Sequence, residues 1–569
     1  MKPIRDRRWN LAMPDGDQVQ RLAADSSLNP LLCGLLIARG IDSPGAASRF
    51  LWPSLSEIHD PFLLKDMDKA VTRLSQALLD GERVCVYGDY DVDGVTSVAA
   101  LIDFLTTIGC DCFYHIPNRF EDGYGLHASG IIEAADRGAR VIITVDCGIT
   151  SCEEADHCSS LGVDLIITDH HMPGSRIPTA CAVINPLRND CPFPFKSLAG
   201  VGVVFNLLIA LRKRLREKGF FETREEPNLR EYLDLVALGT VADIVPLIDE
   251  NRIFVHHGLR ELTSTSRAGI SALKAVAGIA GQVDSGAVGF RLAPRINAAG
   301  RLDDAALGVE LLLTGDARRA AEIAAALNAS NEDRQQLEKS ILEDVLLRIA
   351  NDSSLHNRKT IVLASESWHS GVIGIVASRV VELYHRPTIL ISLQEGNGKG
   401  SGRSIPGFHL HNALQDCAEK LLRFGGHKYA AGLVINEEAL ADFADHFDDV
   451  ADGLLTPDDL LPELRIDAVL EPEEVSLETA EQIATLEPFG MGNPRPIFVM
   501  RGVNPVRTTI LKERHLKVRF HVKGHYFDAI GFNMAGRSPL ADTLDLAFTL
   551  SINTWNGLRT AQVRIKDMK

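Results

Sequence analysis

Short β-rich runs alternate with helix-like stretches from about Met67 onward, and this alternation constrains the fold of the 569-residue chain more than any other feature. The runs read RVCVYGD, CFYHIPN, VIITVDCG, VDLIITDHH and CAVINP, and the helices between them are expected at Val95–Ile108, Ser129–Arg137 and Ser151–Leu161. Strands and helices that alternate at this spacing form βαβ units. The sequence therefore predicts an α/β fold with a mainly parallel sheet.

A proline-free stretch from about Asp316 to Ala350 follows, with apolar residues at helical spacing. Ile341, Val345 and Ile349 fall on one face, and Leu337 precedes them by one turn, which predicts a long connecting helix. A second α/β segment, from about Lys359 to Val450, contains the strands KTIVLAS and PTILISL.

The tail after the turn-rich PFGMGNPRP is rich in strands. HLKVRFHVK alternates cleanly, with one face made of Leu516, Val518, Phe520 and Val522 and the other of His515, Lys517, Arg519, His521 and Lys523. Asn556-Gly557 is a hairpin signal. A small β-barrel fits this pattern. A cationic strand face near Trp555 suits single-stranded nucleic acid, and a solvated outer face explains it equally well.

These changes of pattern predict five parts along the chain. They are a helical N-terminal segment broken by prolines at 1–65, a first α/β domain at 66–310, a connecting helix at 311–352, a second α/β domain at 353–455 and the barrel at 456–569.

Composition narrows the class of protein. No uninterrupted apolar run reaches the length of about 18 residues that a membrane span needs, and the ten cysteines are scattered without a CxxC pair. We therefore expect a cytoplasmic protein with reduced thiols and no membrane contact. The net charge of −17 argues against a purely electrostatic nucleic-acid binder but leaves room for a local basic groove.

Acidic and imidazole side chains follow several predicted strands and, for Asp243, an apolar helix-like run. They are Asp89, Asp91 and Asp93 in VCVYGDYDVDGVTS, Asp146 in TVDCG, Asp169, His170 and His171 in TDHH, and Asp243 in LGTVADIVPL. The carboxyl ends of strands in an open α/β sheet meet at the edge where ligands bind. A single aspartate here is more often a turn residue or a helix cap, but this density of like charges needs a divalent cation.

Oxygen ligands with one or two imidazoles favour Mn²⁺ or Mg²⁺ over structural zinc. Several carboxylates can hold two ions about 3.5–4 Å apart, the arrangement used in phosphoester hydrolysis. The candidate ligands are Asp91, Asp93, Asp146, His170 and Asp243. If the chain stays extended through Asp91 and Asp93, their Cα atoms lie roughly 6–7 Å apart and each carboxylate holds one ion, with Asp146 between the two.

Three further residues are assigned supporting roles. We expect Asp89 to orient or deprotonate the attacking water and Asp169 to orient an imidazole. His171, adjacent to a candidate ligand, is expected to contact the scissile phosphate, the alternative being a structural histidine.

The motifs resemble those of the DHH phosphoesterase family in their order along the chain. DYDVDG, PNRFEDGYGL, TVDCG, TDHH and GTVADIVPL carry the resemblance, which continues in SLAGVGV, APRINAAGRLDD, WHSGVIGIVASR, GSGRSI and FGGHKYAAG, from about Arg83 to Gly432. The full series is similar to the family's single-strand-specific 5′→3′ exonucleases.

The resemblance implies a parallel-sheet DHH domain, a DHHA1 domain and an oligonucleotide-binding (OB) barrel around a central groove. It also implies two Mn²⁺ or Mg²⁺ ions, release of mononucleotides from single-stranded DNA, and a role in repair and recombination. A single-strand-binding protein and a helicase are the implied partners, and a monomer is the implied state.

Basic residues fit the same interpretation. Arg295 and Arg301 flank Asn297 in a predicted short loop with Gly300, and GSGRS is expected to place Ser401 and Arg403 in a glycine-rich loop. By resemblance, Arg295, Ser401 and Arg403 capture the 5′-phosphate and set polarity. The list of expected contacts is completed by Arg119 at the scissile phosphate, His427 in the groove, and Lys517 and Arg519 on the barrel. An ordinary surface ion pair is the alternative for each arginine.

Three other functions remain open at this point. DVDGVT also fits the nucleophile loop of a haloacid-dehalogenase-type phosphatase, with Asp91 as covalent nucleophile. A DHH-family hydrolase of pyrophosphate, cyclic dinucleotides or short oligonucleotides is the second alternative, and a non-catalytic single-strand-binding protein is the third. The barrel-like tail and the long helix favour a polymeric substrate.

Overall fold

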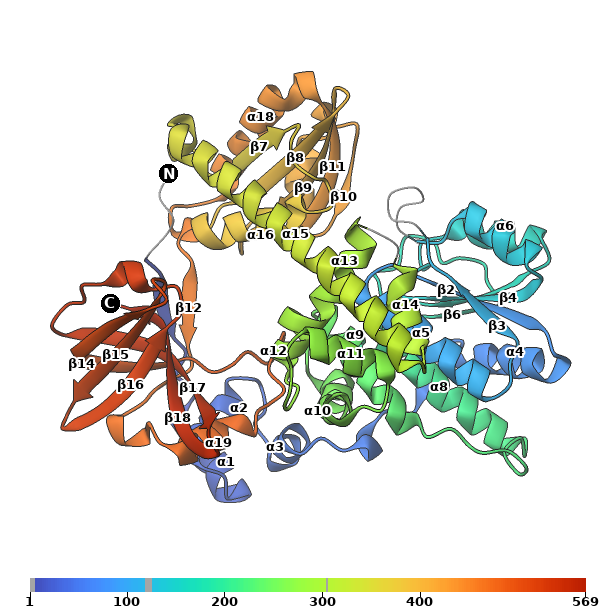
Figure 1. Cartoon of the computed structure of the whole chain (residues 1–569), viewed down its shortest axis with the longest axis horizontal. Helices are drawn as coiled ribbons and strands as arrows, with labels where there is room; N and C mark the ends of the chain where they lie inside the picture. Colours follow the sequence, from blue (N-terminus) through green and yellow to red (C-terminus); the bar gives the residue numbers. More distant parts are fainter. Residues whose placement is uncertain (1–5, 118–124, 303–304) are drawn as a thin grey trace.

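The computed structural model describes residues 6–117, 125–302 and 305–569. Two α/β lobes are joined by one long helix, and a β-barrel lies on the opposite side of the molecule from the first lobe (Figure 1). None of the helices within these ranges is long and apolar enough to cross a membrane.

A five-stranded parallel sheet forms the centre of the first lobe. Its strand order is β3 (Cys112–His115), β2 (Arg83–Gly88), β4 (Ala139–Val145), β5 (Asp164–Thr168) and β6 (Ala182–Ile184). The connecting helices include α5 (Val92–Thr107), α6 (Ala128–Asp136) and α7 (Cys152–Ser160), and α4 (Met67–Asp80) precedes the sheet. Both faces are covered, so the strands are apolar runs rather than alternating ones. The predicted parallel α/β sheet is confirmed.

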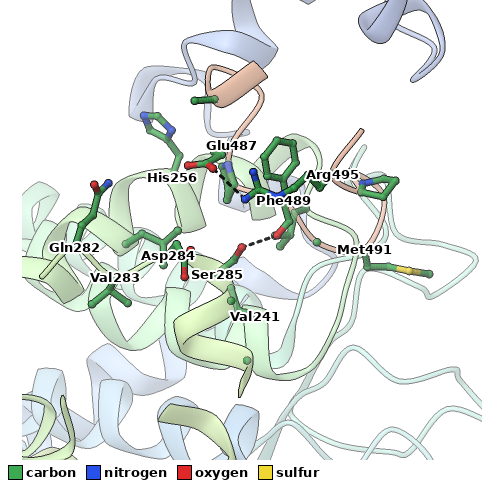
Figure 2. Close-up of a pocket in the computed structure, with 18 of the residues that line it drawn as sticks. Val241, His256, Gln282, Val283, Asp284, Ser285, Glu487, Phe489, Met491 and Arg495 are labelled. Atoms are coloured by element: carbon green, nitrogen blue, oxygen red, sulfur yellow. Dashed lines mark hydrogen bonds and ion pairs between the residues drawn. The ribbon is translucent and has the colours of Figure 1, made fainter. Parts of the chain in front are cut away.

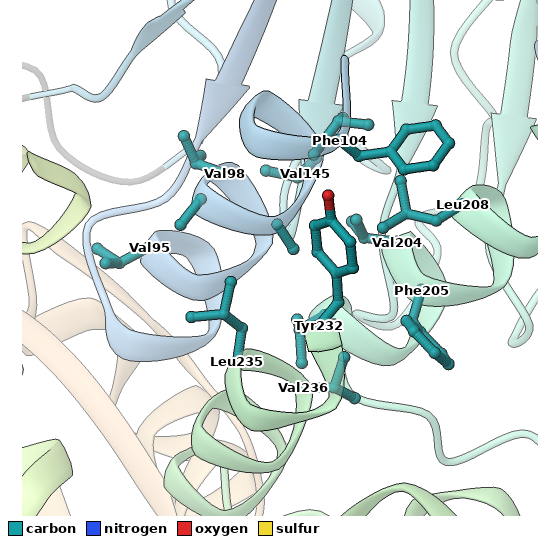
Figure 3. Packing of buried hydrophobic residues seen from close by; sticks show 14 of the residues in the cluster. Val95, Val98, Phe104, Val145, Val204, Phe205, Leu208, Tyr232, Leu235 and Val236 are labelled. Carbon is teal, nitrogen blue, oxygen red and sulfur yellow. The ribbon is translucent and has the colours of Figure 1, made fainter. Parts of the chain in front are cut away.

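An all-helical layer packs on this sheet. It consists of α8 (Gly200–Glu217), α9 (Leu233–Ala242), α10 (Asp249–Ser264), α11 (Ala268–Val276), α12 (Ser285–Ala287), the π-helical turn η4 (Val288–Leu292), α13 (Ala293–Leu302) and α14 (Ala306–Leu313). Figure 3 shows Val95 of α5, Val204 of α8 and Leu235 of α9 in one buried cluster. Because α5, α9 and the first half of α8 are apolar around most of their circumference, they are held inside this layer rather than on the surface.

The long connecting helix is α15, Ala317–Asn351, capped at its start by the side chain of Asp316. Ile341, Val345 and Ile349 are buried against the second lobe, whereas Leu337, one turn earlier, is exposed. The predicted helix and its apolar face are confirmed.

The second lobe contains a mixed sheet. Its strand order is β10 (Arg423–Gly426), β11 (Ala430–Asn436), β9 (Asn397–Arg403), β8 (Thr388–Gln394) and β7 (Ile361–Ser365). Only β7 and β8 are parallel, and they are joined by α16 (Ile373–Tyr384). α17 (Leu410–Asp416) and α18 (Leu440–Leu454) complete the lobe.

The tail forms a closed barrel, because β14 (Phe498–Leu511) pairs with both β15 (His515–Val522) and β17 (Leu544–Trp555). β16 (His525–Gly531) and β18 (Leu558–Met568) complete it, and α19 (Leu477–Ala484) packs on β17 and β18. The apolar face of β15 is buried inside, as predicted.

The N-terminal segment packs on the barrel. β1 (Arg8–Leu11) pairs in parallel with β12 (Glu463–Ile466). The next strand, β13 (Ala468–Val469), pairs in parallel with β14 of the barrel. α1 (Gly16–Ser26), α2 (Pro30–Ile37) and α3 (Pro44–Leu51) share one apolar core with the barrel strands. Pro30 and Pro44 stand at the starts of helices, so they begin these elements rather than break them.

Candidate metal centre

The chain turns sharply after β2, where the first three aspartates lie. Asp91 is the N-cap of α5, and its Oδ1 accepts hydrogen bonds from the backbone N–H groups of Asp93 at 2.9 Å and Gly94 at 3.1 Å. The extended arrangement of Asp91 and Asp93 expected from the sequence is therefore wrong. Capping the helix satisfies two backbone donors that an extended chain would leave to water.

Asp93 lies in the first turn of α5 and faces the start of a second helix. Its two carboxylate oxygens accept from Gly200 N at 2.6 Å and Val201 N at 2.9 Å, at the N-terminus of α8. The partial positive charge of that helix end stabilises the buried anion. A side chain at Gly200 has no space, since a Cβ there would lie 2.6 Å from Asp146 Oδ1.

The remaining candidates come from three separate elements. Asp146 follows β4, Asp169 and His170 follow β5, and Asp243 is the C-cap of α9. The Nε2 atom of His170 lies 3.1 Å from Asp146 Oδ1, 3.6 Å from Asp243 Oδ2 and 3.8 Å from Asp93 Oδ2. Strand ends and one helix end thus converge on a single point.

Side chains of this cluster form three overlapping sets whose ligand atoms lie within 4.8 Å of one another: Asp89, Asp91 and Asp146; Asp93, His170 and Asp243; and Asp146, His170 and His171. All five predicted ligands are brought together. Asp89, predicted to act on water, lies in the same set as Asp91 and Asp146.

The cluster carries more negative charge than a buried site tolerates without compensation. Burial, with the neighbouring carboxylates, raises the pKa of Asp93 to about 7 and that of Asp243 to about 9. The pKa of Asp146 is likewise raised by burial and by Asp93. Burial, followed by the charge of His171, lowers the pKa of His170 to about 4, which keeps this imidazole neutral and able to coordinate a metal.

These observations fit divalent cations. Two buried atoms of the cluster, His170 Nε2 and Asp243 Oδ2, form no hydrogen bond within the described residues. Four or more carboxylates and one neutral imidazole are a donor set suited to Mn²⁺ or Mg²⁺.

His171 differs from its neighbour in charge. Its Nδ1 lies 2.7 Å from Asp169 Oδ1, and Asp169 also accepts from Ile149 N at 2.9 Å. Burial opposes protonation of His171, but the hydrogen bond to Asp169 and the surrounding carboxylates raise its pKa to about 9. Asp169 therefore orients and charges His171, which can donate a hydrogen bond to an anion above the centre.

Ser401 and Arg403 lie on strand β9 and not in the loop expected from GSGRS. Gly398, Gly400 and Gly402 face the packed side of the sheet, where added Cβ atoms would lie 2.6–2.9 Å from Ile391, Leu433 and Leu410. The glycines are thus required by close packing, and the strand alternation turns Ser401 and Arg403 to the other side.

Ser401 and Arg403 contact each other near the start of α16. Arg403 Nη1 lies 3.1 Å from Ser401 Oγ, and a Cβ on Gly374, in the first turn of α16, would lie 2.8 Å from that hydroxyl. Within the described residues Arg403 has no carboxylate in ion-pair range. A serine, an arginine and a helix N-terminus together suit a phosphate.

Arg295 and Asn297 lie in helix α13, not in a short loop. Gly300 is needed there because a Cβ would lie 2.8 Å from the carbonyl oxygen of Tyr90. Arg295 donates to Asn328 Oδ1 at 3.0 Å. Arg301 also belongs to α13, with its side chain outside the described part, and Arg119 lies outside the described residues.

The remaining predicted contacts are at the surface. His427 is exposed between β10 and β11. Arg519 on β15 donates to Asp528 at 2.7 Å, and Lys517 lies 3.8 Å from the same carboxylate. This pairing reduces the cationic character expected of that barrel face. Sequence reasoning missed Gly200 and Gly239, whose only signal was the small residues of SLAGVGV and ALGTVAD.

Three family models match the chain: "DHH family, N-terminal domain" at residues 83–240, "DHHA1 domain" at 357–453 and "RecJ OB domain" at 466–567. Among curated proteins, the single-stranded-DNA-specific exonuclease RecJ of Salmonella typhimurium is 40% identical over 97% of this chain and 98% of its own. RecJ of Bacillus subtilis is 37% identical over 98% of this chain and 70% of its own.

A crystal structure of RecJ from Thermus thermophilus in complex with Mn²⁺ matches with a TM-score of 0.85 and 34% identity, covering 100% of this chain and 80% of that one. A second structure of the same protein holds Mg²⁺, with a TM-score of 0.79. The predicted architecture of a DHH domain, a DHHA1 domain and an OB barrel is confirmed. Because the chain is 40% identical to a curated member over almost the full length of both and has the same three domains, it belongs to the RecJ family.

Proposed function

We propose that this protein is a metal-dependent exonuclease that degrades single-stranded DNA. The observation that carries the proposal is the convergence of Asp93, Asp146 and Asp243 within 3.8 Å of His170 Nε2 in a RecJ-family fold. Neither a phosphatase nor a binding scaffold needs this donor set together with an OB barrel.

Asp91, Asp93, Asp146, His170 and Asp243 would hold two Mn²⁺ or Mg²⁺ ions, with Asp89 beside them. Such ions, when bound, supply Lewis-acid charge stabilisation and lower the pKa of water. Asp89, whose carboxylate lies near those of Asp91 and Asp146, would orient that water. His171, held by Asp169 in its charged form, donates a hydrogen bond to the scissile phosphate. Asp91 already accepts two backbone N–H groups, which disfavours a covalent role for it.

The direction of degradation, from the 5′ end, would be set by residues of the second lobe. Ser401 and Arg403, beside the α16 N-terminus, would hold a 5′-terminal phosphate, and Arg295 would contribute from α13. A strand anchored at that phosphate presents the same bond to the metal centre after each cut, so the proposed products are 5′ mononucleotides. Contacts to phosphates alone explain activity without sequence preference.

The proposed setting is DNA repair and recombination, with a helicase supplying single strands and a single-strand-binding protein covering them. We propose that the enzyme acts as a monomer in the cytoplasm. The ten cysteines, all free in the structure, fit a reducing compartment.

Labelled oligonucleotides test the function directly. The protein is incubated with 5′- or 3′-labelled single strands and duplexes in Mn²⁺, Mg²⁺ or EDTA. Short 5′ products from single strands, and none in EDTA, are expected. Attack on blunt duplexes, release from the 3′ end first, or activity in EDTA would contradict the proposal.

A further inference from the structure

Three consecutive polar side chains are buried where α10 begins. Glu250 and Asn251 are 0% exposed, and Arg252 is 2% exposed. Neighbouring residues in one helical turn point in different directions, so they do not share one partner. A buried amide or charge costs free energy unless it is hydrogen-bonded. Each of the three side chains therefore binds a different part of the chain, and the partners of Asn251 lie next to the metal centre.

The side chain of Asn251 joins two loops. Its Nδ2 donates to the carbonyl oxygen of Ser197 at 2.6 Å and to that of Pro246 at 3.0 Å. Both protons of the amide group are thereby used, whereas its Oδ1 accepts no hydrogen bond from the described residues. Because only an N–H group can bind two carbonyl oxygens, these contacts fix the orientation of the amide. Asn251 thus holds the two loops together.

The first of these loops leads into α8 and binds Asp93. Ser197 lies three residues before Gly200, the first residue of α8. The backbone N–H groups of Gly200 and Val201 bind the two carboxylate oxygens of Asp93. Since these two donors follow Ser197 directly along the chain, a shift of the loop would displace the carboxylate.

The second loop carries Asp243, the C-cap of α9. Pro246 lies three residues after it, and between them Ile244 has a φ of 62°, a left-handed value that a β-branched residue rarely adopts. Such a conformation persists where the surrounding structure imposes it. The hydrogen bond from Asn251 to Pro246 is one of the contacts that hold the loop in this conformation.

The segment before the barrel also holds the second loop. The backbone N–H of Leu247 donates to the carbonyl oxygen of Met491 at 2.8 Å. A Cβ on Gly490 would lie 2.7 Å from Leu247 Cδ1, so the loop and the segment are in close contact. Figure 2 shows the hydrogen bond of 2.6 Å by which Ser285 of α12 binds the carbonyl oxygen of Phe489 in the same segment. The loop after α9 is therefore fixed at a second point.

We propose that Asn251 is a positioning residue of the metal centre, which keeps the loop that binds Asp93 and the loop that carries Asp243 at a fixed separation. The inference rests on the proposed function. Asp93 and Asp243 belong to the same candidate ligand set, which is completed by His170. A second set consists of Asp89, Asp91 and Asp146. Asn251 therefore controls the affinity of the first set for its ion and leaves the second set unchanged.

Calorimetric titration with Mn²⁺ tests this selectivity. Asn251→Ala removes both hydrogen bonds, so the affinity for one of the two ions is expected to fall about 10- to 100-fold. The other ion should bind as it does in the wild type. Asn206→Ala is the matched control, because Asn206 is an equally buried amide that donates to Gly202 O at 3.0 Å and to Glu250 Oε2 at 3.2 Å. It joins neither loop, so this variant should bind both ions with wild-type affinity.

Thermal unfolding in EDTA separates positioning from stability. Both alanine variants lose buried hydrogen bonds, so both should unfold at a lower temperature than the wild type. A lower unfolding temperature of Asn251→Ala with wild-type affinity for both ions would show that Asn251 is merely structural. Equal weakening of Mn²⁺ binding in the two variants would also overturn the proposal. If Asn251→Ala does not fold, Asn251→Ser, which keeps a hydroxyl donor, is measured in the same way.

Rescue by the metal provides an independent measurement. Cleavage of a labelled single strand by Asn251→Ala should be slow at a low concentration of Mn²⁺ and should approach the wild-type rate as the concentration is raised. A rate that stays low at every concentration would contradict a role in metal affinity. Failure of the proposed function looks different, because the wild type itself would then bind no Mn²⁺ or leave single strands intact.

Discussion

Individual carboxylates in the metal centre differ because each is bound by a different part of the backbone. Asp91 caps its own helix, and Asp93 accepts two N–H groups from the start of α8. His170 is neutral while the adjacent His171 is charged through Asp169. The role of each aspartate or histidine in the centre is therefore determined by its local hydrogen bonds, and not by its residue type or its order along the chain.

Replacing Asp146 tests the centre itself. Asp146→Asn removes a charge shared by two of the candidate ligand sets, so hydrolysis of a labelled single strand should fall by more than about 100-fold. Strand binding measured in EDTA should be largely retained. Asp156→Asn, an exposed aspartate on α7, is the control. Digestion by Asp146→Asn at the wild-type rate would show that the ligand assignment is wrong.

A glycine behind the ligands gives a second test at this scale. A Cβ at Gly239 would lie 2.3 Å from Thr96 Oγ1 and 3.0 Å from Asp93 Oδ1. Gly239→Ala should displace Asp93 and weaken Mn²⁺ binding about 10- to 100-fold, measured by calorimetry. Gly281→Ala, where nothing lies within 4 Å of the added Cβ, should bind Mn²⁺ normally. Equal affinities of the two variants would exclude a positioning role for Gly239.

The sequence predicted which residues meet at the centre, because strand order and the edge rule bring strand ends together. It did not predict how Asp91 and Asp93 face the site, since the decision between an extended chain and a helix cap depends on two local hydrogen bonds. The glycines of GSGRS show the same limit. They resemble a phosphate loop in sequence, yet they are small because Leu433 lies against Gly400 and Leu410 against Gly402.

At the scale of elements, the spacing of apolar residues was sufficient to predict the long helices and strands. The apolar positions of α15 and β15 are buried as their spacing requires. Elements defined by few residues could not be predicted. The π-turn at Phe290 leaves no periodic trace, and it runs directly into α13, so Arg295 and Asn297 lie in a helix where a short loop was expected.

The contact between α8 and α10 predicts a pH-dependent stability. Glu250 is fully buried and accepts from Asn206 Nδ2 at 3.2 Å and His59 N at 2.7 Å. Burial raises its pKa to about 7, with Asp249 adding to the shift and His59 opposing it. The folded protein therefore holds this proton more tightly than the unfolded chain. Its stabilising effect is complete below about pH 4.5 and is lost as the pH rises through about 7.

Guanidinium unfolding of the wild type and Glu250→Gln across this range measures the effect. The stability of the wild type relative to the variant should fall by up to about 3 kcal/mol between about pH 4.5 and 8. Because both proteins share every other titrating group, the difference isolates Glu250. A difference that is constant with pH would show that Glu250 keeps its ordinary pKa.

On the scale of the whole molecule, the first 60 residues join parts that are distant in sequence. β1 pairs with β12, some 450 residues later, and α1–α3 share a core with the barrel. Such contacts leave no local pattern, because short helices punctuated by prolines look alike whether they are exposed or docked. The N-terminal segment, which leads into the first lobe, thereby holds the barrel in addition to the chain connection from the second lobe.

One buried arginine holds this arrangement together. Arg252 of α10 donates to the carbonyl oxygens of Phe50 at 2.7 Å, Glu487 at 2.9 Å and Pro488 at 3.3 Å, and its guanidinium stacks 3.8 Å from the Phe50 ring centroid. It thus ties the N-terminal segment and the segment before the barrel to the first lobe. Burial and the nearby Arg39 lower its pKa to about 9, so three carbonyl dipoles take the place of a carboxylate.

Arg252→Met should therefore weaken the attachment of the N-terminal segment and of the segment before the barrel to the first lobe, as well as the stability of α10. The three carbonyls lose a charged donor, and each such hydrogen bond contributes about 1.5–3 kcal/mol, so a loss of about 3 kcal/mol or more is expected. Arg252→Lys keeps the charge but cannot donate to three directions in one plane, and it should recover only part of the loss.

Thermal unfolding gives the stability, and limited proteolysis reports on the segment between α19 and β14, which should become cleavable in Arg252→Met. Arg318→Met, on an arginine that is 88% exposed in α15, should change stability by no more than about 0.5 kcal/mol. If Arg252→Met unfolds at a lower temperature but this segment stays protected, Arg252 stabilises the first lobe alone and the barrel is held by the shared apolar core of α1–α3.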